Sequence, residues 1–179
     1  MHKTISFEPS EKSINKAIQE LKLFREDFLH KIEFMRQRIA DDIAINAQFG
    51  FDSSDVERSW IGGVGATNVS RKADVKVDVN EESGDVTVVV AHGDDAVWVE
   101  FGTGVHYNGN VGSSPNPLGG KLGLTIGSYG QHNGQYDVWR YYENGEIYST
   151  HGVPATMPMY NSAMDVINRI NSIAQEVFG

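Results

Sequence analysis

The stretch SINKAIQELKLFREDFLHKIEFMRQRIADDIAINAQ, residues 13–48, determines the fold of this chain. Its apolar side chains recur at spacings of four and three, the pattern of a continuous apolar face on a helix. Because Pro9 suits a first helical turn and Ser10 can cap it, the pattern predicts a helix over residues 10–49, with Gly50 as its stop. The residues of the apolar face are Ile14, Ile18, Leu21, Phe28, Ile32, Met35 and Ile39, interrupted by Arg25.

The expected helix is too long for a domain of this size. At 1.5 Å per residue it extends about 55 Å, which is more than the width of a compact domain of similar length. Part of it must therefore pack on a neighbouring copy, project into solvent, or bend. For the C-terminal part of the helix, a core position within one chain and packing between subunits are equally reasonable. Farther from the sheet, packing between subunits is favoured. Phe24 and Phe34 lie off the main face and favour contacts on more than one side.

Composition narrows the class of protein. The chain has 179 residues, 40% of them hydrophobic, which predicts one domain over residues 1–179 with a real core. It has no cysteine, so disulfides and thiolate chemistry are excluded. Without an apolar run long enough for a bilayer or a signal peptide, it is expected to be soluble and made in a cytoplasm. The net charge of -9 argues against a protein that grips the DNA backbone.

A valine-rich hairpin is predicted over residues 74–91. Val75, Val77 and Val79 alternate with polar residues, and Val86, Val88 and Val90 resume after a Glu-Glu-Ser-Gly-Asp turn. We expect these valines to form the face that covers the long helix. Before the hairpin, residues 53–60 are interpreted as a turn or one short helix, and residues 62–65 as a flexible glycine-rich connector, since a phosphate-binding loop would need a following Lys-Ser/Thr.

The second half of the chain alternates short elements with a long loop. Residues 94–101 suit either a short helix or a buried strand, and Asp94 and Asp95 at their start favour the helix. The Gly/Pro-rich residues 102–135 are expected to form a loop insertion. The Asn144-Gly145 pair between aromatic segments predicts a hairpin over residues 136–150. Residues 157–178 predict a C-terminal helix that lies on the sheet beside the long one. The predicted fold is therefore α+β, with the two long helices packed on a small antiparallel sheet and an inserted loop and hairpin.

Catalytic and metal-binding patterns are weak. His92, Asp94, Asp95, Glu100 and His106, with His132 and His151, could contribute metal ligands, but none shows a recognised ligand spacing. A Gly-x-Ser-x-Gly nucleophile motif does not occur either. We therefore predict no catalytic residue, cofactor or metal, and keep a metal-dependent hydrolase as a minor alternative.

Two short segments carry most of the functional information. The first is Val99-Glu100-Phe101-Gly102-Thr103-Gly104, and the second is Gly152-Val153-Pro154-Ala155-Thr156-Met157-Pro158-Met159. A carboxylate between two apolar residues is costly to bury unless donors satisfy it. Glu100 is therefore expected to cap the following Gly-Thr-Gly turn, or else to make a contact between subunits. Trp139, Tyr141, Tyr142 and Tyr148 are either plain hairpin stabilisers or a docking surface for another protein.

Together these features resemble the neck or tail-completion proteins of long-tailed bacteriophages, also described as head-tail joining or minor tail proteins. The resemblance covers nearly the whole chain, including the inserted loop and aromatic hairpin. Members more often have Arg-Pro-Phe where this chain has Thr156-Met157-Pro158-Met159, which removes a cation that could pair with Glu100. The interface or structural-motif residues are then Glu100, Phe101, Gly102, Thr103, Trp139, Tyr141, Tyr142, Tyr148, Gly152, Pro154, Ala155, Pro158 and Met159.

The resemblance implies a structural virion protein that assembles as a ring at the neck, after synthesis in the bacterial host. Its implied partners are further copies of itself, a portal-side adaptor or head-closure protein, and a tail terminator or tail tube protein. Double-stranded DNA would pass through the lumen without specific binding, and no membrane is involved. A tail terminator at the end of the tail tube is the main alternative. A free-standing adaptor or inhibitor domain is a further one.

Overall fold

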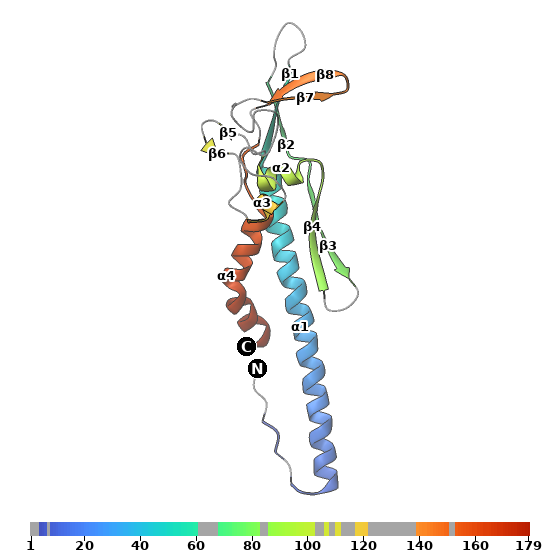
Figure 1. The fold of residues 1–179 in the computed structure, drawn as a ribbon. Coiled ribbons are helices and arrows are strands. Elements are labelled where there is room, and N and C mark those ends of the chain that lie inside the picture. The colour runs from blue at the N-terminus through green and yellow to red at the C-terminus, as the bar shows by residue number, and fades with distance from the viewer. Residues whose placement is uncertain are drawn as a thin grey trace.

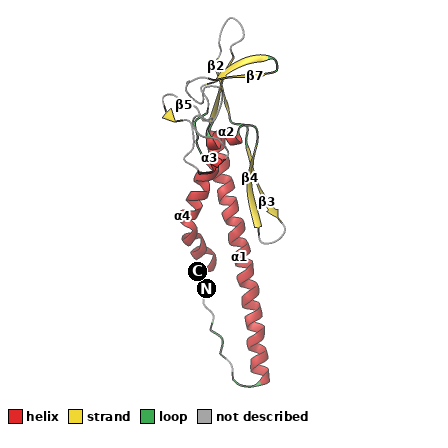
Figure 2. Ribbon diagram, in the orientation of Figure 1, coloured by secondary structure: helices red, strands yellow, loops and turns green. Residues whose placement is uncertain are grey.

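The structure is a computed structural model that describes residues 4–6, 8–60, 68–82, 86–102, 106–107, 110–111, 117–121, 139–150 and 153–179. It confirms the α+β class (Figure 1, Figure 2). A long N-terminal helix, α1, and a C-terminal helix, α4, pack together, and small antiparallel sheets lie beside them.

Helix α1 spans Glu11–Ser53 and is about 64 Å long at 1.5 Å per residue. Ser10 caps it as predicted, because its hydroxyl oxygen accepts a hydrogen bond from the backbone N–H of Ser13. The predicted stop at Gly50 is wrong, since the helix continues to Ser53. A Cβ on Gly50 would lie 2.8 Å from the Cβ of Pro158, so this glycine permits a close approach of α4 rather than ending the helix.

Helix α4 spans Pro158–Phe178 and runs antiparallel to the C-terminal half of α1 (Figure 1). Its first residue lies against Gly50, and its last aromatic ring, Phe178, lies 5.6 Å from the ring of Phe28. Its main contacts are with α1 and with the short helix α2, Ala96–Phe101. The expectation that it lies on a sheet is therefore corrected, because it packs helix against helix.

The valine-rich hairpin consists of β3, Lys76–Glu82, and β4, Val86–His92, and it lies along α1. Val79 is paired with Val89, and Val77 with Ala91. Directly paired residues share a face, so Val89 and Ala91 lie with Val77 and Val79 toward α1. The predicted face of the return strand is wrong by one residue, because this register places Val86, Val88 and Val90 on the outer face.

One side chain anchors this hairpin to α1. The side-chain amide of Gln48 donates to the backbone oxygen of Val75 at 3.0 Å and accepts from the backbone N–H of Val77 at 2.7 Å. The amide therefore acts as a substitute strand partner at the edge of β3. These two hydrogen bonds fix the position of the hairpin along the axis of α1.

A four-stranded antiparallel sheet lies at the C-terminal end of α1, in the order β2-β1-β8-β7. Strands β7, Trp139–Glu143, and β8, Glu146–Thr150, form the predicted hairpin, and Asn144 and Gly145 have the positive φ angles of 52° and 82° that a type I′ turn requires. The turn or short helix predicted over residues 53–60 is wrong. This segment forms β1, Asp55–Trp60, because β2, Asn68–Lys72, and β8 supply backbone partners on both sides.

The insertion is not wholly irregular. Within residues 102–135 the structure has two short strands, β5 at His106–Tyr107 and β6 at Asn110–Val111, and a short helix, α3, at Pro117–Lys121. The expectation of an unstructured loop is corrected at these positions. The rest of the insertion, and the connector at residues 62–65, lie outside the described residues.

The core lies where the end of α1, α2 and the segment before α4 meet. It contains Ala47, Phe51, Val75, Ala96, Val99 and Val153. This cluster lies at the C-terminal end of α1. Buried apolar residues continue from it along the contact between α1 and α4, namely Ala40, Ala44, Val166, Ile173 and Val177.

Candidate interaction surfaces

The two segments singled out in the sequence meet at one joint. The backbone oxygen of Val99 accepts a hydrogen bond from the backbone N–H of Thr156 at 3.0 Å. The carboxylate of Glu100 accepts hydrogen bonds from the backbone N–H groups of Met159, at 2.8 Å, and Tyr160, at 3.0 Å. Glu100 is only 6% exposed, so these donors compensate the cost of burying its charge.

Glu100 caps α4 from another element of the chain. The residue at the N-cap position is Met157, with a left-handed φ of 54°, and methionine has no side-chain oxygen with which to cap a helix. A carboxylate at this end also interacts favourably with the helix dipole. The sequence predicted a cap on the Gly-Thr-Gly turn, but these hydrogen bonds go to α4, and Thr103 lies outside the described residues.

The joint also includes the end of α1. The hydroxyl groups of Ser54 and Thr156 lie 3.0 Å apart, and Pro158 contacts Gly50. Three helix ends are therefore held together by hydrogen bonds and close packing. These contacts assign the two motifs a structural role within the chain.

The other predicted interface residues are distributed over two places. Pro154 and Ala155 are half-buried before α4, Pro158 is buried, and Met159 packs on the core. Phe101 and Gly102 end α2, and Gly152 lies outside the described residues. In the aromatic hairpin, Tyr142 is 77% exposed and is paired with the exposed Ile147. Tyr148 is half-buried, and Trp139 and Tyr141 are described only by their backbone in β7.

The candidate metal ligands are not brought together in the part of the chain that the structure describes. Asp95 accepts hydrogen bonds from both terminal nitrogens of Arg71 and from the backbone N–H of Asp74. His92 lies 3.8 Å from a carboxylate oxygen of Asp78 on the exposed face of the hairpin. Among the described residues, no group of three or more His, Asp or Glu side chains could hold a metal ion. His132 and His151 are outside that set.

A long series of exposed apolar side chains lies on α1. Residues 11–34 are here called the projecting half of α1, and most of them extend beyond the C-terminal end of α4 and the tip of the β3–β4 hairpin (Figure 1). Helix α4 ends beside Phe28. Large apolar side chains of the projecting half are at least 40% exposed: Ile14, Ile18, Leu21, Leu23, Phe28, Leu29, Ile32 and Phe34. The apolar face predicted from the sequence does not include Leu23 and Leu29, whose exposure becomes evident only from where α4 ends.

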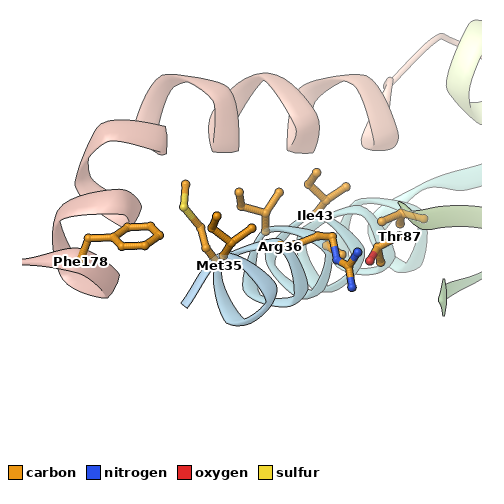
Figure 3. Close-up of a pocket in the computed structure, with 9 residues that line it drawn as sticks. Met35, Arg36, Ile43, Thr87 and Phe178 are labelled. Atoms are coloured by element: carbon orange, nitrogen blue, oxygen red, sulfur yellow. The ribbon is translucent and has the colours of Figure 1, made fainter. Parts of the chain in front are cut away.

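An apolar groove continues this surface toward the body of the molecule. It has a volume of 380 Å³ and lies between α1, β4 and the end of α4. Figure 3 shows Met35, Arg36 and Ile43 on α1, with Thr87 at one end and Phe178 of α4 at the other. Partly exposed apolar side chains of α1 thus continue from Ile14 to the edge of the core, except where Phe28 contacts Phe178.

None of the helices in the described ranges combines the length and apolar character needed to cross a bilayer. Comparisons with protein-family models, with curated proteins and with solved structures found no match.

Proposed function

We propose that this chain is a structural protein of a bacteriophage particle, of the neck or tail-completion type. In this proposal several copies form a ring that joins the capsid connector to the tail and lets DNA pass. The observation that carries it is the projecting half of α1, whose large apolar residues stay at least 40% exposed even though Phe28 contacts the end of α4. Exposed apolar surface of this extent marks a site of protein association.

The mechanism is surface complementarity rather than chemistry. The ring offers one face to a portal-side adaptor or head-closure protein and another to a tail terminator or tail tube protein. The aromatic hairpin is the candidate docking element, because Tyr142 and Ile147 present an exposed pair at the end of the molecule away from the projecting half. A net charge of -9 suits a passage that DNA crosses without being held.

Deleting the gene from the phage that encodes the chain tests the proposal. A joining protein predicts filled heads and separate tails of normal length, visible by negative-stain microscopy. A tail terminator limits growth of the tube, so its loss predicts tails of abnormal length. Intact, infectious particles after the deletion would contradict both. Supplying the wild-type gene from a plasmid is the control, and it should restore joined particles.

A further inference from the structure

Between residues 14 and 32 one face of α1 is apolar and basic, whereas Glu11 lies on the same face at the start of the helix. At about 100° per residue, this front face falls within an arc of about 120°. Lys22 and Arg25 are exposed on it, and every acidic residue between positions 14 and 32 lies outside the arc. The apolar members of the front face are Ile14, Ile18, Leu21, Phe28, Leu29 and Ile32.

The opposite face is apolar and acidic. Its centre contains Leu23 and Phe34, each 61% exposed. Around them lie four acidic residues, with Lys31 at the edge. Toward the start of the helix the same face continues with two basic residues, Lys12 and Lys16. The acidic residues of this back face are Glu20, Glu26, Asp27 and Glu33. A solvent-facing helix surface would not need two large apolar side chains among these charges.

We propose that the front face of one copy packs on the back face of the next copy. This inference rests on the proposed ring and names its subunit contact. Packing two front faces would oppose Lys22 and Arg25 with the same cations, and packing two back faces would oppose acids with acids. Front-to-back packing buries both apolar faces and pairs opposite charges. Such a head-to-tail contact uses two different patches, and it closes into a ring when the rotation permits.

The heights of the charges along α1 agree with this contact. In a ring, rotation from one copy to the next does not move a residue along the ring axis. Arg25 and Asp27 differ by two residues, or about 3 Å along the helix. When neighbouring α1 helices run side by side, Arg25 of one copy therefore meets Glu26 and Asp27 of the next.

Charge reversal in the full-length chain tests the contact. Arg25→Glu alters only the front face and Asp27→Lys only the back face, so each variant should need at least about tenfold more protein to associate in sedimentation velocity. An equimolar mixture of the two should associate like the wild type, because every junction again pairs opposite charges. Lys16→Glu is the matched control for Arg25→Glu. It also replaces a cation by a carboxylate, but on the back face, and it should leave association intact.

Cysteine crosslinking extends the test to weak association, because the chain has no cysteine of its own. Under mild oxidation the double variant Leu21→Cys/Leu23→Cys should give a ladder of disulfide-linked species with more than two chains. Each single variant should form no disulfide-linked species, because its cysteine has no cysteine opposite it. Crosslinking of Leu21→Cys alone, stronger association of Arg25→Glu, or no ladder at the highest concentration would overturn the proposal. A ladder together with intact particles after gene deletion would instead retain the contact and refute the function.

Discussion

The two halves of α1 share one periodic stripe but meet different surroundings. In the C-terminal half the buried residues are Ala40, Ala44, Ala47 and Phe51, which lie under α4, β3 and β4. In the projecting half the corresponding stripe carries large side chains that stay exposed. The three buried alanines let neighbouring elements approach α1 closely. The large exposed side chains of the projecting half instead leave apolar surface for another chain. Side-chain size along one helix therefore separates packing within the chain from packing between chains.

Truncating a phenylalanine in each half should give the largest difference. Phe51→Ala removes a fully buried ring and should lower the free energy of unfolding by about 3–5 kcal/mol. Phe34→Ala removes an exposed ring and should change it by less than about 0.5 kcal/mol. Urea denaturation at low protein concentration measures both. Equal losses in the two variants would show that the projecting half is packed within the chain.

The Glu100 joint should come next in size. Glu100→Ala leaves the N–H groups of Met159 and Tyr160 without their carboxylate, and it should cost about 2–3 kcal/mol of unfolding free energy. Glu176→Ala breaks an ion pair with Arg38 at the other, exposed end of α4, and it should cost less than about 1 kcal/mol. If the two variants lose the same amount in thermal denaturation, capping by Glu100 is not what holds the start of α4.

Gly50→Ala tests the close approach of α1 and α4, because the sign of the change in unfolding free energy depends on it. In an open helix position this change stabilises by about 1 kcal/mol. Here the new methyl group meets Pro158, so we expect a loss of about 1–2 kcal/mol instead. A higher melting temperature for Gly50→Ala would mean that α4 does not approach α1 at this point.

Salt should have the smallest effect, and it should act on the projecting half alone. Raising the ionic strength about tenfold screens the exposed charges of the front and back faces and should weaken association on the order of threefold. The unfolding free energy should change little, since the core of the packed half is apolar. Sedimentation velocity and urea denaturation in the same buffers measure the two effects, and association that strengthens with salt would contradict the charge pairing.

Several features of the fold were predictable because local chemistry determines them. The stripe from Ile14 to Ile39 predicted α1, Ser10 its start, and Asn144-Gly145 the hairpin turn. Other features depend on partners distant in the chain. Residues 55–60 become a strand only because β2 and β8 pair with them. Gly50 lies within α1, and Pro158 leaves no room there for a larger side chain.

The joint shows the same division. A buried carboxylate at Glu100 was predictable from its apolar neighbours, but its donors lie 59 and 60 residues later in the chain. No periodicity connects positions so far apart. The exposed Leu23 could not be recognised either, since exposure depends on where α4 ends.

Amide hydrogen exchange along α1 tests the central claim most directly, namely that the projecting half is built for contact between copies. In the dilute chain, residues 40–51 should be protected and residues 14–34 should exchange rapidly. On assembly, protection should rise in residues 14–34 and stay constant in residues 40–51. Equal protection of both halves in the dilute chain, or residues 14–34 still exchanging rapidly in the assembled ring, would contradict the account.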